Sequence, residues 1–350
     1  MSDFHTLTIK DITRETPKAV SIEFDIPSTL SDAYNFIAGQ YITIKTVVDG
    51  NEIRRAYSIC SAPKSGSLRV AVKEIEGGTF SSIANNKLKI GDTLDVHTPE
   101  GSFLLESNPN AQNHYAAFAA GSGITPIISM IKCVMEEEPN SSFVLVYGNQ
   151  NPTETIFHKK LLALQANYPN RLFIEFFYSR SQEDGARFGR IEKSTINFIT
   201  KNKFKDTTFK SFYLCGPETM INTVTEVLTE NNIANEDIHF ELFTSSAETT
   251  EIEADLDGQT KITILVDDEE SSFVMDQKKT ILDAALEEDI DAPYSCQGGV
   301  CSSCICKITE GKAVMGKNSI LTDAELEEGL VLACQAYPTS STIKVDFDDV

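Results

Sequence analysis

The chain of 350 residues lacks several features that would place it in a common class of proteins. It has no run of about 18 apolar residues, the length that a membrane-spanning helix needs, so we expect no membrane partner. Residues Met1–Thr6 hold no basic segment followed by an apolar stretch, and we therefore expect no secretory leader. No internal repeat is visible. These absences favour a cytoplasmic protein. The length of the chain suggests two or three domains, and its 41% hydrophobic residues suffice for their cores.

Basic residues are scarce relative to acidic ones. Lys and Arg number 30 against 52 Asp and Glu, which gives a formal net charge of −22. Such a chain repels phosphates, so we expect no nucleic-acid partner. Residues 244–258 carry five acidic side chains and no basic one, and residues 259–350 carry 18 acidic and 7 basic ones. This acidity serves solubility in the simplest interpretation; the alternative hypothesis is that the C-terminal region attracts a basic partner protein.

Half of the eight cysteines are scattered along the chain. Cys60, Cys133, Cys215 and Cys306 stand in apolar stretches or in candidate functional motifs, and no disulfide framework is visible in their spacing. Free thiols of this kind fit a reducing compartment. We interpret Cys306 as a small buried hydrophobic residue.

The other four cysteines, Cys296, Cys301, Cys304 and Cys334, have the spacing C-x4-C-x2-C with a distant fourth member, which is typical of plant-type [2Fe–2S] clusters. Two bridged irons need four converging thiolates, so a tight loop supplies three and a distant segment the fourth. We expect Gly298 and Gly299 to let this loop wrap around the cluster, because glycine adopts backbone angles that other residues resist. A zinc site or unrelated structural thiols are the alternatives, but zinc sites usually pair two short spacings.

Hydrophobic periodicity divides the chain into three folded regions. Residues 1–108 show short alternating runs such as Ala19–Phe24 and Leu68–Lys73, which predict an antiparallel barrel or sandwich. Residues 109–243 alternate apolar strands with helical runs and predict a doubly wound parallel sheet. After an acidic linker at 244–258, residues 259–350 predict a hairpin, a capped helix at Thr280, the cysteine loop and a closing strand. This set of elements resembles the β-grasp fold of ferredoxins.

Two stretches of the first region carry candidate binding residues. Arg54–Ile59 ends a strand with Arg, Tyr and Ser side chains, and Val72–Ile83 runs through a Gly-Gly turn into a helix whose start we expect Thr or Ser to cap. With Gly39–Tyr41 upstream and Thr98–Phe103 downstream, these stretches resemble the flavin domain of the ferredoxin–NADP reductase superfamily. The resemblance implies that the flavin contacts Tyr41, Arg55, Ala56, Tyr57, Ser58, Val72, Lys73, Gly78, Thr79, Ser81 and Ser82, with Ser58 near the reactive ring nitrogen.

The second region has a glycine loop and a cysteine motif at strand ends. Gly121-Ser122-Gly123 follows a buried strand, and we expect Thr125 near the N-cap and Pro126 in the first turn of the next helix. This is not the GxGxxG pattern of ordinary dehydrogenases, but it resembles the nucleotide domain of the same superfamily. The resemblance implies a nicotinamide nucleotide held by Gly121, Gly123, Thr125, Pro126, Ser179, Arg180, Cys215, Gly216, Pro217 and Phe243.

The nucleotide and flavin types follow from finer features of these loops. Ser179 and Arg180 after a strand could hold a 2′-phosphate, which favours NADPH over NADH. The Gly77–Ser82 loop resembles FAD-binding relatives and not the FMN-binding phthalate-dioxygenase type. The resemblance also implies catalytic roles for Ser58, Cys215 and Glu241, with Glu241 on a proton path.

The order of the three regions implies one activity. A nicotinamide releases a hydride, whereas an iron–sulfur cluster accepts one electron at a time, and a flavin exchanges both, so electrons must pass through the flavin. The module order resembles the reductase components of phenylacetyl-CoA epoxidase and related oxygenases, which implies an oxygenase or another one-electron acceptor protein as partner. The alternatives are a reductase for another acceptor, such as a ring-hydroxylating dioxygenase, a desaturase or a separate carrier, and a redox-sensing module without turnover.

Overall fold

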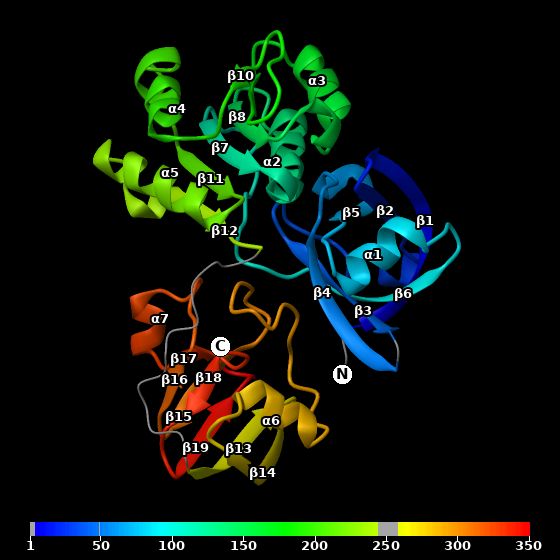
Figure 1. Ribbon diagram of the computed structural model, residues 1–350, viewed down its shortest axis with the longest axis vertical. Helices are drawn as coiled ribbons and strands as arrows, with labels where there is room; N and C mark the ends of the chain where they lie inside the picture. Colours follow the sequence, from blue (N-terminus) through cyan, green and yellow to red (C-terminus); the bar gives the residue numbers. More distant parts are fainter. Residues whose placement is uncertain (1–3, 49, 244–257) are drawn as a thin grey trace. The chain divides into compact units, whose positions relative to one another are not determined.

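The computed structural model describes residues 4–48, 50–243 and 258–350, which form two compact units joined by the chain segment after Phe243. Figure 1 shows both units along the chain. The predicted acidic linker at 244–258 lies outside the described residues except for Gly258. No helix among the described residues is long and apolar enough to cross a membrane.

The first unit begins with a closed antiparallel sheet. Its strands are β1 (Phe4–Thr16), β2 (Ala19–Asp25), β3 (Tyr41–Val48), β4 (Asn51–Ser58), β5 (Leu68–Lys73) and β6 (Thr93–His97). They pair in the order β4-β3-β6-β1-β2-β5, and a bridge between Ile59 and Val70 joins the two outer strands into a barrel. Alternate residues fill its interior, as the period-two pattern predicts; Ile22 and Ile42 are fully buried. The helix α1 (Thr79–Asn86) and the turns η1 (Ser28–Leu30) and η2 (Pro63–Ser65) complete this half.

A parallel sheet forms the second half of this unit. Its strands are β7 (His114–Ala120), β8 (Ser142–Asn149), β9 (Leu172–Tyr178), β10 (Arg187–Phe188), β11 (Ser211–Cys215) and β12 (Ile238–Glu241), in the order β10-β9-β8-β7-β11-β12. The connections contain α2 (Ile124–Glu137), α3 (His158–Asn167), α4 (Lys193–Asn197), α5 (Glu218–Glu230), the π-helix η5 (Phe198–Lys203) and the turns η3 (Gly121–Gly123), η4 (Pro152–Glu154) and η6 (Asn235–Asp237). The strand order reverses between β7 and β11, and ligands bind at such a reversal beyond the carboxyl ends of the strands.

The two halves of the first unit share one hydrophobic core. Ala38, Cys60 and Phe103 of the barrel half pack in the same buried cluster as Ile127 and Ile131 of α2. The barrel and the parallel sheet are therefore held together by buried apolar side chains as well as by polar contacts.

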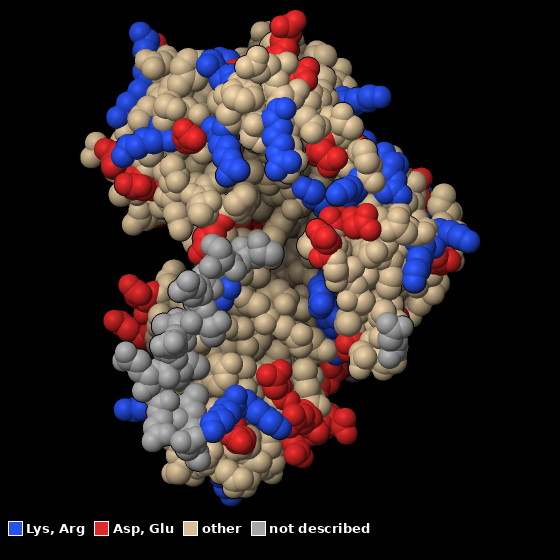
Figure 2. All heavy atoms as spheres, viewed as in Figure 1, with Lys and Arg blue, Asp and Glu red and all other residues tan. Residues whose placement is uncertain are grey.

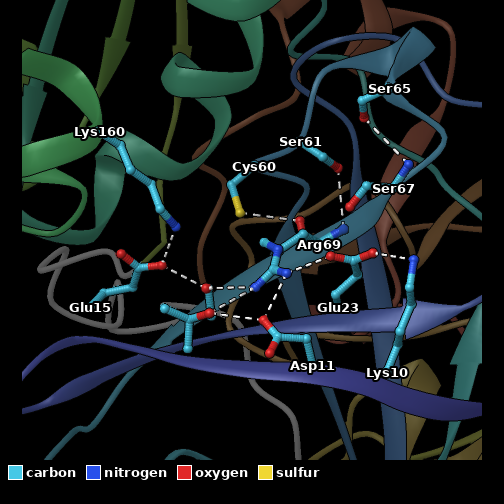
Figure 3. A network of polar contacts seen from close by, with 12 residues as sticks. Lys10, Asp11, Glu15, Glu23, Cys60, Ser61, Ser65, Ser67, Arg69 and Lys160 are labelled. Atoms are coloured by element: carbon cyan, nitrogen blue, oxygen red, sulfur yellow. Dashed lines mark hydrogen bonds and ion pairs between the residues drawn. The ribbon is translucent and has the colours of Figure 1, made fainter. Parts of the chain in front are cut away.

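A polar network extends this junction at the protein surface (Figure 3). Lys160 of α3 donates to Glu15 of β1 at 2.6 Å, and Ser21 of β2 donates to the same carboxylate at 2.6 Å. Arg69 of β5 donates to Ser21 at 3.1 Å and to Asp11 at 2.9 Å. Three barrel strands are thus connected to a helix of the nucleotide half.

The second unit is a mixed sheet with the cysteine loop on it. The strands β13 (Gln259–Val266), β14 (Glu269–Asp276), β15 (Ile305–Glu310), β17 (Leu330–Leu332) and β19 (Thr342–Asp346) pair in the order β14-β13-β19-β15-β17, and β16 (Ala313–Met315) pairs with β18 (Ala336–Pro338). Two helices, α6 (Ile281–Glu287) and α7 (Asp323–Glu327), accompany them. Thr280 caps α6 as predicted, because its hydroxyl accepts the N–H of Asp283 at 3.1 Å. The three predicted folds, a barrel, a doubly wound sheet and a β-grasp ferredoxin domain, are confirmed.

Candidate functional site

The strand β4 carries the first group of candidate flavin residues. Successive residues of a strand point to opposite sides, so Arg55 and Tyr57 share one side, and Ala56 and Ser58 share the other. The register with β3 places Tyr41 opposite Ser58. Ser58 is buried, whereas Arg55 and Tyr57 are partly exposed.

The helix α1 meets this strand from the end of β5. The ring of Tyr57 lies 5.5 Å from the ring of Phe80 in the first turn of α1. Val72 is buried in β5, and Lys73, the last residue of that strand, is partly exposed. The structure thus brings together two stretches that lie some 20 residues apart in the sequence and that we predicted to serve one ligand.

Gly78 is the N-cap of α1, and no side chain caps this helix, so the predicted Thr or Ser cap is wrong. The hydroxyl of Ser81 instead accepts the N–H of Ile75 at 3.2 Å, and Ser82 donates to Glu74 at 3.4 Å. Thr79 is exposed. Because no side chain among the described residues accepts from the first N–H groups of α1, the helix start remains suited to an anion.

The glycine loop after β7 lies against the end of β11. A Cβ on Gly123 would stand 2.0 Å from the carbonyl oxygen of Cys215, and one on Gly216 would stand 3.1 Å from the nitrogen of Ala120. Gly121 has a φ of +56°, and its carbonyl accepts the hydroxyl of Tyr147 at 2.8 Å. Glycine is thus required here by backbone contact at the point where the strand order reverses.

Thr125 and Pro126 both lie in the first turn of α2, as expected. The N-cap is Gly123, and Thr125 follows it by two residues. The hydroxyl of Thr125 donates to the carbonyl of Ser122 at 3.0 Å and so closes the turn η3. Pro217 holds the corresponding place before α5, where it is the N-cap.

The predicted catalytic residues converge where the two halves of the unit meet. Ser58 at the end of β4 donates to Oε2 of Glu241 at 3.1 Å. Glu241 stands beside Cys215, because β11 and β12 pair in parallel with these two residues in register. A barrel residue and two residues of the parallel sheet, far apart in the sequence, therefore form one polar group.

Burial changes the acidity of this group. Desolvation raises the pKa of Glu241 to about 8, against the opposing effect of the hydrogen bond from Ser58. Burial raises the pKa of the Cys215 thiol well above its ordinary value, and the neighbouring Glu241 acts in the same direction. At neutral pH both groups hold their protons, so the site presents neutral donors beside Ser58.

The remaining nucleotide candidates lie further along the same edge of the sheet. The N–H groups of Ser179 and Arg180 donate to the carbonyls of Asn149 and Gln150 at 3.0 and 2.9 Å. Next to this turn a cavity of about 320 Å³ is lined by Phe177, Arg187, Phe188, Gly189, Arg190, Glu192, Ser194, Thr195 and Phe198. Phe243 follows β12 and is 36% exposed.

In the second unit, the four predicted cysteines gather in two pairs. Hydrogen bonding from Cys301 and backbone N–H groups of the loop lower the pKa of Cys296 to about 6, and hydrogen bonding from Cys304 lowers the pKa of Cys334. Cys301, Cys304 and Cys334 are buried. In the described part of the chain, no three His, Cys, Asp or Glu side chains surround a position for one metal ion.

The cysteine loop turns at a different residue from the one predicted. Gly299 has a φ of +70°, as expected for a left-handed turn, but the other left-handed residue is Gln297, with a φ of +52°, and not Gly298. The N–H of Gly298 points to the sulfur of Cys296 at 3.3 Å. Backbone N–H groups directed at sulfur are the usual outer support of such ligands.

Sequence reasoning missed two polar residues of this loop. Gln335 donates to the carbonyl of Gln297 at 3.3 Å and lies 3.7 Å from the sulfur of Cys334, so it connects the fourth cysteine to the loop. The hydroxyl of Ser295 is buried and has no hydrogen-bond partner among the described residues. The only sequence signal for Ser295 was its place directly before Cys296. The only sequence signal for Gln335 was its place directly after Cys334.

Three protein-family models match successive parts of the chain. Residues 6–104 match the oxidoreductase FAD-binding domain family, residues 118–226 the oxidoreductase NAD-binding domain family, and residues 264–339 the 2Fe-2S iron-sulfur cluster binding domain family. The chain is 38% identical over 352 residues to a 1,2-phenylacetyl-CoA epoxidase subunit from Escherichia coli, and the match covers 99% of both chains. The chain belongs to the oxygenase reductases of the ferredoxin–NADP reductase superfamily.

A second relative supports the same family, and a solved structure has the same fold. The reductase is 31% identical over 352 residues to the ferredoxin reductase component of 3-ketosteroid-9-alpha-monooxygenase from Rhodococcus rhodochrous, with 97% and 96% of the two chains covered. The fold of phthalate dioxygenase reductase resembles it with a TM-score of 0.62, at 22% identity and 98% coverage of both chains. The predicted oxidoreductase class and the FAD, NAD-type and [2Fe–2S] groups are confirmed, and the zinc alternative is wrong.

The residues of the reductase fit these three groups. Two thiol pairs suit a cluster in which each iron takes two thiolates. The Ser295 hydroxyl, which has no hydrogen-bond partner in the described part of the chain, lies in the same loop. The uncapped start of α1 suits a flavin phosphate. The loop after β7 has glycine at 121 and 123, so Ser122 is its only side chain, and Gly123 lies against the backbone of Cys215; such a loop suits the close approach of a pyrophosphate.

Proposed function

We propose that the reductase takes a hydride from NAD(P)H and delivers electrons through FAD and the [2Fe–2S] cluster to a multicomponent oxygenase of the phenylacetyl-CoA epoxidase type. The 38% identity to the Escherichia coli protein of that epoxidase, over nearly the full length of both chains, carries the choice of oxygenase. The three bound groups supply hydride donation, conversion of electron pairs to single electrons, and single-electron storage. We propose further that regions 1–108, 109–243 and 259–350 each hold one of these groups, in a cytoplasmic protein whose eight cysteines are free thiols before the cluster is inserted.

The protein residues have distinct tasks in this proposal. Tyr41 and the stretch Arg55–Ser58 line the flavin ring and its first phosphate, together with Val72 and Lys73, and the start of α1 from Gly78 to Ser82 holds the pyrophosphate. The loop from Gly121 to Pro126 and the stretch Cys215–Pro217 hold the nicotinamide nucleotide, and Phe243 covers a ring. Lys73 would lie between the flavin and the nicotinamide nucleotide in this proposal. Its Nζ would stand 3.7 Å from a Cβ on Gly121, which belongs to the nucleotide loop.

Ser58, Cys215 and Glu241 form the polar centre between the two rings in this proposal. Their convergence from the two halves of the unit is the observation that supports it. Glu241 is protonated at neutral pH and can pass a proton through Ser58, whereas the buried Cys215 thiol stays neutral beside the nicotinamide. Cys296 and Cys301 would hold one iron of the cluster, and Cys304 and Cys334 the other.

NADPH is the proposed donor, with NADH as the alternative. Ser179 and Arg180 follow β9, where a 2′-phosphate would lie, and the adjacent cavity contributes Arg187 and Arg190. Arg187 also pairs with Glu175 at 3.2 Å, which leaves Arg180 and Arg190 as the phosphate ligands that we propose. Anaerobic titration with NADPH and with NADH, followed by flavin absorbance, decides between the two donors.

A reductase for another acceptor is the second candidate. The relative of Rhodococcus rhodochrous is named for a ketosteroid monooxygenase and is 31% identical, so the family serves different oxygenases. Reconstitution with a purified epoxidase and a purified ring-hydroxylating dioxygenase separates these candidates. A redox sensor without turnover predicts no bleaching of the flavin by either nicotinamide.

The modular path is tested by Cys301→Ser. We expect this variant to lose the cluster spectrum and at least about 100-fold of the electron delivery to the oxygenase, because one thiolate ligand is missing. Bleaching of the flavin by NAD(P)H should keep its wild-type rate. A folded variant that also lost flavin bleaching would contradict the modular path.

A further inference from the structure

The helix α2 connects the candidate nucleotide loop to the candidate flavin strand. Its N-terminus follows Gly121–Gly123, and one flank carries Ser129 and Lys132, which lie three residues apart and therefore share a helix face. Lys132 lies seven positions after Thr125, which is about 10 Å along the helix axis. Both sites are thus attached to one short, rigid element.

Two side chains of α2 bond to the backbone just after β4. The hydroxyl of Ser129 donates to the carbonyl of Ser61 at 2.7 Å, and Nζ of Lys132 donates to the carbonyl of Cys60 at 2.8 Å. Ser129 and Ser61 are buried. These carbonyls lie two and three residues beyond Ser58, so the end of the candidate flavin strand is held by the helix.

Lys132 makes its hydrogen bond with a charged ammonium that is partly buried. Burial lowers its pKa, and among the described residues Cys60 is its one hydrogen-bond acceptor and no carboxylate forms an ion pair with it. A partly buried ammonium without a carboxylate costs free energy that a neutral side chain would avoid. Its long stem and charged donor reach the backbone carbonyl across the junction, where a charge-assisted bond is stronger than a neutral one.

The far end of α2 is held by the barrel half as well. Glu137 accepts from Ser107 at 2.7 Å and pairs with Lys64 of η2. The side chain of Met130 leaves no space for a Cβ on Gly39, since the two would stand 2.6 Å apart. The helix is therefore fixed along its length against the barrel half, and Ser129 and Lys132 are the bonds nearest to Ser58.

We propose that Ser129 and Lys132 are positioning residues, which set the distance and angle between the nicotinamide and the flavin by holding the stretch Ser58–Ser61 against α2. The proposal rests on the proposed function, because the two rings must bind at these two places. Hydride transfer needs the reacting atoms about 3–3.5 Å apart, and a misplacement of about 1 Å can lower a rate about 100-fold. The side chains of Ser129 and Lys132 donate to the barrel half and not to the nucleotide loop, so binding and transfer should respond differently.

The test is rapid mixing of the flavin-loaded reductase with the nicotinamide that reduces the wild type. For Lys132→Met and Ser129→Ala we expect the limiting rate of flavin bleaching to fall roughly 10- to 100-fold. The nicotinamide dissociation constant should change less than about twofold, and the long-wavelength charge-transfer absorbance of the complex should weaken. Lys132→Arg, which keeps the charged donor, should recover part of the rate.

Lys160→Met is the matched control, because it removes another ammonium of the same junction, paired with Glu15 at 2.6 Å. It should keep the wild-type rate and absorbance. If Lys132→Met and Ser129→Ala bleach at the wild-type rate with full charge-transfer absorbance, even with a lower Tm, the two residues are structural and the inference is wrong. If the wild type with full flavin content is bleached by neither NADH nor NADPH, the proposed function itself fails.

Discussion

At the scale of single residues, Glu241 links acidity to both stability and turnover. Its ordinary pKa lies near 4.5, and burial raises it to about 8 in the folded protein. Between these values the folded state binds the proton and the unfolded state does not, so stability must fall as the pH rises from 4.5 toward 8. The contribution is complete below about pH 4.5 and is lost above about pH 8.

Glu241→Gln tests this linkage, because glutamine is uncharged at every pH. We expect the free energy of unfolding of the wild type to decrease from pH 6 to pH 8 relative to that of the variant, as measured by urea unfolding. If Glu241 passes a proton through Ser58, flavin bleaching should also slow about 100-fold in the variant. Glu236→Gln, an exposed neighbour in η6, is the control and should follow the wild type. Parallel pH profiles for the wild type and Glu241→Gln would contradict the raised pKa.

At the scale of elements, the contact of Gly123 with β11 allows a sharp test of the nucleotide crevice. Gly123→Ala would place a Cβ 2.0 Å from the carbonyl of Cys215, and backbone cannot move aside as a side chain can. We expect a loss of about 1–3 kcal/mol of stability and weaker nicotinamide binding, measured by urea unfolding and by flavin-bleaching titration.

Gly148→Ala is the control for this substitution. It adds the same methyl group at the end of the neighbouring strand β8, where the nearest atom is the flexible end of Ile191 at 3.3 Å. This variant should bind nicotinamide like the wild type. Equal effects of the two substitutions would mean that the crevice is not formed by the contact between the loop and β11.

The sequence predicted some features of these strands and helices but not others. The alternation in β5 and the apolar runs of β7 and β8 are local signals, and they predicted the barrel and the parallel sheet. The start of α1 at Gly78 and the left-handed Gln297 could not be predicted, because side-chain preferences are small compared with tertiary contacts. The spacing of the four cluster cysteines named them without any relative, whereas the flavin and nucleotide candidates could be named residue by residue only through family resemblance.

Hydrogen bonds between residues far apart in the sequence could not be predicted at all. The bond from Ser58 to Glu241 joins residues 183 positions apart, and those of Ser129 and Lys132 span 68 and 72 positions. The sequence of α2 shows Ser129 and Lys132 only as polar residues of an amphipathic helix, whose usual place is a solvated face. Periodicity contains no information about which strand lies opposite that face, so these contacts required the structure.

At the scale of the whole molecule, the two units differ in net charge. Residues 259–350 have a net charge of −11, half of the total of −22, in about a quarter of the chain. Figure 2 shows acidic side chains on the face of this C-terminal unit that is turned to the viewer. Glu327 and Glu328 are exposed at the end of α7, which packs against β17, and β17 leads directly to Cys334. A basic acceptor would therefore meet negative charge close in sequence to the cluster.

Electron delivery to a basic acceptor should therefore depend on salt. With cytochrome c as the acceptor, we expect the second-order rate to fall roughly tenfold between 50 and 500 mM NaCl, because the Debye length shrinks from about 14 Å to about 4 Å. Limiting flavin bleaching at saturating nicotinamide should stay constant, since it involves no acceptor. The double substitution Glu327→Gln and Glu328→Gln should make the salt dependence less steep, whereas Glu236→Gln should not. If the second-order rate does not change with salt, long-range charge does not steer the acceptor, because dissolved ions would screen such an attraction. The acidic surface would then serve solubility alone.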